Sequence, residues 1–144
     1  MVKFQILEKE AVADVAFEAF GKTASELFEN SALALFEQMA NTKRVLGKKK
    51  IRVAFQDADI ERLLYGFLSD IVFRKDTERT VFSAAKLKVA KKDGVWTLTG
   101  QIAGQKVDEL AGSVLRTDVK AVTFYGFKVE KTKAGFKAKI VLDI

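Results

Sequence analysis

The chain has 144 residues, 49% of them hydrophobic and 31% charged, and its formal net charge is +6. This size and composition are typical of a globular protein, and we expect residues 1–144 to form a single domain. The sequence contains no Cys and no His, which excludes disulfides, thiol nucleophiles, imidazole metal ligands and His-dependent triads. A metal held by this chain would therefore sit on oxygen ligands, which favours Ca²⁺, Mg²⁺ or Mn²⁺.

Hydropathy and charge limit where the protein is expected to be located and which partners it is expected to have. No stretch approaches the roughly 20 consecutive apolar residues of a membrane span, and the N-terminal residues do not have the pattern of a signal peptide. We expect a cytoplasmic protein with no membrane partner, which the absence of Cys also fits. The positive charge would favour direct contact with RNA, or it would serve solubility alone, since many lysines alternate along strands where they should face water.

The first elements in chain order are two strands and a helix. Alternating apolar residues predict strands over Val2–Leu7 and Asp14–Phe20. Thr23 and Glu26 then have the spacing of a capping box, which predicts the start of a helix. Apolar residues recur with helical spacing from there to about Ala40.

A third strand and a second helix follow. Ile51–Phe55 alternates as a strand does. Asp57 or Asp59 is placed to cap a helix that we expect to reach about Phe73, with Asp76–Glu78 in the turn behind it.

The second half of the chain predicts hairpins. Asp93 and Gly94 form a strong turn signal between two alternating segments. Gly104–Asp118 is weakly patterned and predicts a long loop, and the last strands are expected over Val119–Lys131 and Phe136–Ile144. The order ββαβαββββ predicts an α+β fold: a two-layer sandwich of a mostly antiparallel or mixed β-sheet, with two helices packed on one face.

Carboxylates in unusual places are the first candidates for chemistry. Asp14 stands in an apolar run. A charged residue there is expected at the start of a strand, exposed to solvent, or bound to a ligand. A turn-forming role at the strand entry also explains it. A strand that runs to Ile144 would bring the Asp143 side chain and the terminal carboxylate together. Close carboxylates repel unless a cation or basic group neutralises them, so Asp14 would complete a hard-cation site. Exposed terminal acids are nevertheless common.

Other candidates are less specific. Lys120 precedes an alternating strand and could equally be a solvated lysine. Lys48–Lys50 is expected in a solvated loop. Aromatic residues of the second half could stack on RNA bases, although core packing explains most of them and no RNA-binding motif accompanies them: these are Trp96, Phe124, Tyr125 and Phe127.

Several segments, in order along almost the whole chain, together resemble the archease family. Two lie in the predicted helices, Phe28–Phe36 and Leu63–Leu68, and the second is followed by Asp76-Thr77-Glu78. The others are the strand entry Ala13-Asp14-Val15, the strand Val119-Lys120-Ala121-Val122-Thr123-Phe124 and the ending Leu142-Asp143-Ile144.

The resemblance implies a β-sheet with two helices and a divalent metal site. The family's metal-binding positions correspond to Asp14 and Asp143, with Ile144 contributing oxygens, and its functional lysine corresponds to Lys120. Tyr125 stands where the family often has His, and Ala11 and Ala16 replace its usual His and Gly, which removes any imidazole contribution near the metal or a partner.

The resemblance also implies a non-enzymatic role in tRNA splicing. Archeases help an RtcB-type ligase acquire GMP from GTP and turn over repeatedly. Lys120 would then contact a phosphate or the ligase during activation. Some archeases are instead linked to a tRNA cytosine-5 methyltransferase, which implies a chaperone-like adaptor as the alternative.

Overall fold

The computed structural model describes residues 2–7 and 14–144, and it confirms the α+β class and the predicted order of two helices and seven strands. The helices are α1 (Ala24–Met39) and α2 (Ile60–Glu78). The strands are β1 (Phe4–Ile6), β2 (Asp14–Gly21), β3 (Lys49–Asp57), β4 (Thr80–Lys92), β5 (Val95–Lys106), β6 (Ala121–Thr132) and β7 (Gly135–Asp143). Neither helix has the length and apolar content of a membrane span within the described residues.

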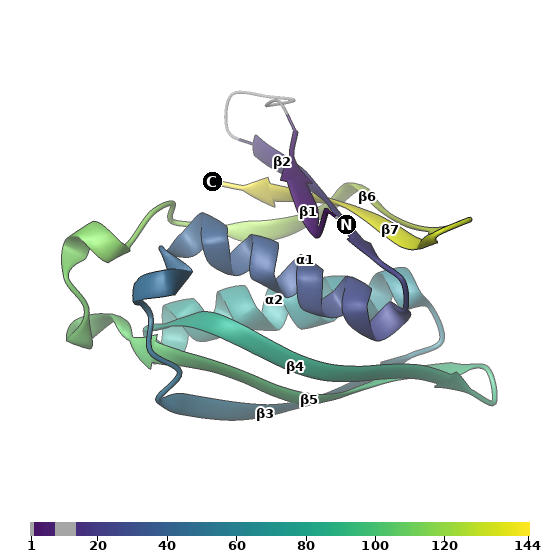
Figure 1. Ribbon diagram of the computed structural model, residues 1–144, viewed down its shortest axis with the longest axis horizontal. Helices are drawn as coiled ribbons and strands as arrows, with labels where there is room; N and C mark the ends of the chain where they lie inside the picture. The colour runs from purple at the N-terminus through teal and green to yellow at the C-terminus, as the bar shows by residue number, and fades with distance from the viewer. Residues whose placement is uncertain (1, 8–13) are drawn as a thin grey trace.

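The strands form two antiparallel sheets rather than one. The upper sheet has the order β1-β2-β7-β6 and the lower sheet the order β3-β5-β4. Both helices lie between the sheets (Figure 1). The reason is visible in α1, which buries more than the single stripe that the sequence predicts: even Asn30 and Ser31 are buried. A helix covered on more than one side needs a second layer of strands.

The start of α1 is the capping box that the sequence predicts. The Thr23 hydroxyl accepts from the Glu26 backbone N–H at 3.1 Å, and the Glu26 carboxylate accepts from the N–H of Lys22 at 3.1 Å. The first bond satisfies a backbone donor that the first helical turn leaves without a partner. The second bond reaches Lys22, one residue before the Thr23 N-cap whose N–H a capping box would bond. The helix ends at Met39 because Ala40 is extended and bridges to Leu115.

Helix α2 is longer than predicted. Asp59 caps it by accepting from the Glu61 backbone N–H at 2.8 Å, but the helix continues through Glu78. The prediction of a helix end at Phe73 and a turn at Asp76–Glu78 is therefore wrong. Arg74 explains the extension, since its guanidinium donates to Asp70 and to Glu78, both at 2.8 Å, and so ties three successive turns together.

The core fills the space between the two sheets. Phe28 of α1 and Phe67 of α2 stack with ring centroids 6.5 Å apart, and Phe36 meets Phe82 of the lower sheet at 5.7 Å. The largest fully buried side chains come from both helices and both sheets: Phe17, Phe28, Phe36, Phe67, Phe82, Leu27, Leu35, Leu64, Leu68, Ile71, Leu98 and Ile102.

Two connections differ from their predictions and one agrees. Lys49 and Lys50 belong to β3, so the predicted loop at Lys48–Lys50 is wrong for both. The predicted loop over 104–118 begins later, because β5 continues to Lys106, and two short 3₁₀ helices follow. The turn at Asp93 and Gly94 is confirmed, with φ of 53° and 78°, the positive pair that a two-residue hairpin requires.

Side chains of the helices close one edge of each sheet. On β4, the Leu87 backbone N–H donates to the Glu29 carboxylate at 2.8 Å, and the Val89 N–H donates to the Ser25 hydroxyl at 2.8 Å. On β6, the Val129 N–H donates to the Glu61 carboxylate at 2.9 Å. These backbone donors have no strand partner within residues 2–7 and 14–144, because β4 and β6 are outer strands, so the bonds fix each helix against an outer strand.

Candidate metal and partner site

Asp14 and Asp143 lie directly opposite each other on neighbouring strands. They are register partners in the β2–β7 ladder, and Asp143 is also the partner of Ala121 on β6. Directly opposed residues of antiparallel strands have Cβ atoms about 5 Å apart and project from the same face. The structure thus brings together two of the three acidic positions that the sequence selects.

The acidic pair faces away from the helices. Side chains of the β2–β7 ladder that point toward the helices are fully buried, as Phe17 and its register partner Ile140 show. Side chains alternate along a strand, so Asp14 and Asp143 belong to the outward set, and both are half-buried. Ile144 follows at the end of β7 and packs partly against the core, beside the start of β2 (Figure 1).

Neither carboxylate of the pair forms a hydrogen bond or an ion pair within residues 2–7 and 14–144. Two carboxylates this close repel each other when both are ionised, and a cation between them would relieve that repulsion. The donors are hard oxygens, which suit Ca²⁺, Mg²⁺ or Mn²⁺. The described residues contain no group of three or more Asp, Glu, His or Cys side chains that could hold a metal, so the pair alone would leave coordination positions open.

Lys120 lies next to the acidic pair. Its backbone N–H donates to the Asp143 carbonyl at 2.8 Å, just before β6 begins at Ala121. The side chain is exposed and forms no ion pair in the described part of the chain. The structure therefore places Lys120, Asp14, Asp143 and Ile144 at one end of the upper sheet and leaves the Lys120 ammonium available.

Sequence reasoning missed Lys75, which holds the segment in front of Lys120. Its ammonium lies 2.7 Å from the Asp118 carboxylate, 2.9 Å from that of Asp76 and 2.6 Å from the Val119 carbonyl, and its side chain is only 11% exposed. The sequence does contain a feature that indicates Lys75: it follows Val72 by three residues and so continues the helical spacing of the buried stripe.

Electrostatics around Lys75 agree with this geometry. The hydrogen bond from Lys75 is the largest of the effects that lower the pKa of Asp118, and Lys120 adds a smaller Coulombic effect. Burial acts to lower the pKa of Lys75, but the bonds to Asp118 and Asp76 outweigh it and raise that pKa. Lys75, Asp76 and Asp118 line a hollow of about 330 Å³ together with Arg79, Arg116 and Met39.

Tyr125 lies in an irregular part of β6, where the register with β7 shifts between Thr123 and Lys128. Its side chain is 87% exposed, and the Thr123 hydroxyl donates to its carbonyl at 3.2 Å. Of the other aromatics, Phe127 is buried and Phe124 is 46% exposed. Ala11 lies outside the described residues.

Comparisons with known proteins agree on one family. The profile of the Archease protein family (MTH1598/TM1083) matches residues 4–144. The chain is 38% identical to "Protein archease" of Methanothermobacter thermautotrophicus, over 94% of this chain and 95% of the relative. It is 35% identical to "Protein archease" of Methanosarcina barkeri, over 92% and 90%.

Two solved structures share the fold. The solution structure of Methanobacterium thermoautotrophicum protein 1598 superposes with a TM-score of 0.82 at 33% identity, over 99% of both chains. The crystal structure of an archease of Thermotoga maritima, described as a possible chaperone, superposes with a TM-score of 0.62 at 18% identity, over 96% of both chains.

Proposed function

Because the chain belongs to the archease family, we propose that it is a non-catalytic accessory protein that promotes guanylylation and multiple turnover of an RtcB-type RNA ligase in tRNA splicing. The resemblance of its motifs to those of archeases points to the ligase. A chain without Cys or His also offers few groups for catalysis of its own.

The observation that carries the proposal is the opposed pair Asp14 and Asp143, whose carboxylates lack partners among the described residues. In this proposal the pair and Ile144 oxygens hold one divalent cation. Such a cation neutralises phosphate charge during nucleotidyl transfer. Lys120, held beside the pair by its backbone bond to Asp143, contacts a phosphate or a ligase carboxylate as a point charge.

The test is RNA ligation under multiple turnover. An RtcB-type ligase from the same source is combined with GTP, Mn²⁺ and excess RNA bearing 2′,3′-cyclic phosphate and 5′-hydroxyl ends, and this protein is added at substoichiometric amounts. We expect product well beyond one turnover per ligase. Asp143→Asn and Lys120→Ala should abolish most of that gain, whereas Asp93→Asn, in the exposed hairpin turn, should keep it. An active ligase that gains nothing from the wild-type protein would overturn the proposal.

A second candidate is a chaperone-like adaptor for a tRNA cytosine-5 methyltransferase. It is supported by the exposed aromatic surface of Phe124 and Tyr125, which rests on Tyr65 of α2 with centroids of Tyr65 and Phe124 4.9 Å apart. Exposed aromatics of this kind are typical of protein interfaces. This candidate predicts that the protein co-purifies with such a methyltransferase and changes its choice of site on tRNA, and that Tyr125→Ala weakens both effects.

A further inference from the structure

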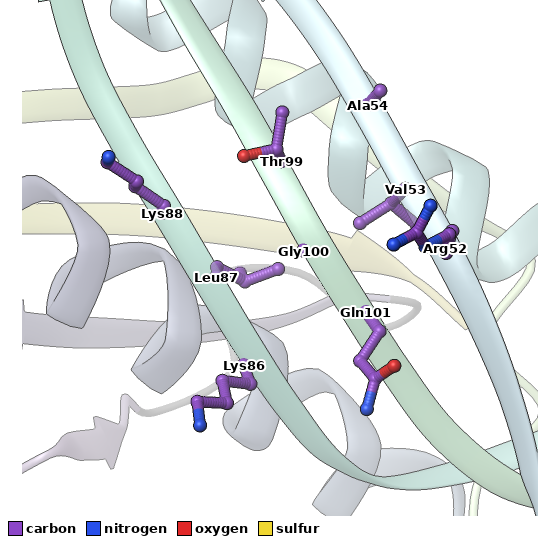
Figure 2. A pocket seen from close by; sticks show the side chains of 9 residues that line it. All are labelled: Arg52, Val53, Ala54, Lys86, Leu87, Lys88, Thr99, Gly100 and Gln101. Carbon is purple, nitrogen blue, oxygen red and sulfur yellow. The ribbon is translucent and has the colours of Figure 1, made fainter.

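The lower sheet has an outer face that no helix of the described residues covers. Val53, Leu87 and Leu98 point toward the helices and are buried, so the alternate residues of the same strands point outward. The register places Lys86, Gln101 and Arg52 in one row across β4, β5 and β3, and it places Lys88, Thr99 and Ala54 in the next. Figure 2 shows these side chains on the three strands that run side by side.

All the charge on this face is positive. Its cations are Lys50, Arg52, Lys86 and Lys88, and each of them is exposed. The other outward positions from 50 to 56, 84 to 90 and 97 to 103 hold only Ala, Thr and Gln, with no Asp or Glu. We call the four cations and the small residues between them the basic face.

The cations of the basic face have no counter-charges in the part of the chain that the structure describes. None of the four forms an ion pair or a side-chain hydrogen bond there. Neighbouring cations behave differently, since Lys49 on the same strand meets Glu78 at 3.7 Å. The carboxylate of Glu29, beside β4, accepts from the Leu87 backbone N–H. The positive potential of the face is thus left for an external anion.

The shape of the basic face suits an extended anion. Three of its cations, Arg52, Lys86 and Lys88, line a hollow of about 640 Å³. The central strand β5 contributes the shorter side chains of Thr99 and Gln101, and the cations lie on the outer strands β3 and β4. Lys86 and Lys88 are two residues apart, which separates them by about 7 Å, and β3 and β4 flank β5 at about 10 Å from each other. A phosphate chain lying in the hollow would be within reach of cations from both sides.

We propose that the basic face binds the phosphodiester backbone of a single RNA strand. The face has no aromatic residue, so bases have nothing to stack on, and contacts fall on phosphates rather than on sequence. An arginine with two parallel donors and three lysines as point charges are the groups that bind phosphate. The choice of RNA over DNA rests on the proposed function, but binding by this face does not.

The basic face and the acidic pair lie on opposite sides of the molecule. Asp14 and Asp143 project from the outer surface of the upper sheet, and the basic face is the outer surface of the lower sheet, with both helices between them (Figure 1). An RNA strand on the basic face therefore leaves the proposed ligase contact free, and the protein is able to hold substrate and enzyme at once.

The test measures binding of a labelled, unstructured 20-nucleotide RNA by fluorescence anisotropy between 50 and 200 mM salt, without ligase or metal. Four phosphate contacts predict a log–log salt slope of about −3 for a single strand. The variant Lys50→Gln/Arg52→Gln/Lys86→Gln/Lys88→Gln should bind at least tenfold more weakly at 50 mM salt with a slope near zero. DNA of the same sequence should bind the wild type within about threefold, because both backbones present the same phosphates.

A matched variant carries the same change in net charge elsewhere: Lys3→Gln/Lys22→Gln/Lys131→Gln/Lys133→Gln, at four exposed positions. It should lose less than threefold. Equal loss in both variants would mean diffuse attraction and would overturn the proposal, as would a poly-glutamate peptide that competes as well as RNA at equal charge.

Two further measurements keep the result independent of folding and of the proposed function. In NMR spectra of the wild type, RNA should shift amides of residues 50–54, 84–90 and 97–103; shifts confined to β6 and β7 would overturn the assignment. Asp143→Asn should bind RNA as the wild type does. A loss of ligase activation can therefore be distinguished from a loss of RNA binding by the basic face.

Discussion

The ammonium of Lys75 on α2 lies 2.7 Å from the carboxylate of Asp118, a residue 43 positions later in the chain. The same ammonium donates to the Val119 carbonyl at 2.6 Å, directly before Lys120. A helix side chain thus fixes the segment that carries the proposed functional lysine.

We predict that Lys75→Met lowers the free energy of unfolding by about 1–2 kcal/mol, since it removes hydrogen bonds to a carboxylate and a largely buried carbonyl contact. Urea unfolding measures this. Lys133→Met, at an exposed position, should change stability by less than about 0.5 kcal/mol. Equal stability of Lys75→Met and wild type would show that the contact does not hold the segment.

The same contact predicts the pH dependence of stability. The pKa of Asp118 is lowered from its ordinary value of 3.8, so its stabilising effect is complete above that value and is lost as pH falls through the lower folded pKa. The pKa of Lys75 is raised from 10.5, so its effect is complete below that value and is lost as pH rises through the higher folded pKa. Unfolding midpoints of wild type and Lys75→Met should therefore differ most between these limits and converge at both extremes.

Metal binding tests the acidic pair without any ligase. Asp14→Asn and Asp143→Asn remove one oxygen charge each from opposed positions, and we expect each to weaken Mn²⁺ or Ca²⁺ binding at least tenfold by calorimetry. Asp93→Asn, in the hairpin turn at the far end of the lower sheet, is the control and should bind as the wild type does. Unchanged affinity in Asp14→Asn would remove that residue from the site.

Gly100 should be the glycine least tolerant of substitution in the lower sheet. Its φ is +151°, and a Cβ there would lie 2.1 Å from the Lys86 carbonyl oxygen on β4. We predict that Gly100→Ala lowers the free energy of unfolding by about 3 kcal/mol. Gly66→Ala is the matched control, because Gly66 lies in α2 with open space around it, and this change should stabilise by about 0.5–1 kcal/mol.

Local chemistry explains which parts of the fold could be predicted from the sequence. Thr23 with Glu26 and Asp93 with Gly94 act within a few residues, and both features are confirmed. The end of α2 could not be predicted in the same way, because the bonds of Arg74 to Asp70 and Glu78 outweigh a turn-like composition. The division of strands into two sheets depends on burial around α1, which a single apolar stripe does not reveal.

The site shows the same limit. An apolar context singles out Asp14, the end of the last strand singles out Asp143, and the resemblance to archeases gives Lys120 its role. Only the β2–β7 register places the two aspartates opposite each other. The basic face could not be predicted from the sequence because its cations come from two strands, β3 and β4, with more than 30 residues between Arg52 and Lys86, and because the sequence predicts a loop at Lys50. Sequence reasoning misses Lys75 because the predicted helix ends at Phe73, whereas α2 continues to Glu78 and carries Lys75 toward Asp118.

The bonds that Ser25, Glu29 and Glu61 make to strand backbone have a consequence for how the protein behaves at high concentration. A strand edge with free N–H groups is a template on which another chain can add a strand. On β4 the N–H groups of Leu87 and Val89, and on β6 the N–H group of Val129, are already bonded to side chains from α1 and α2. Another chain therefore cannot pair with these two edges at those positions, and three helical residues oppose fibril-like self-association there.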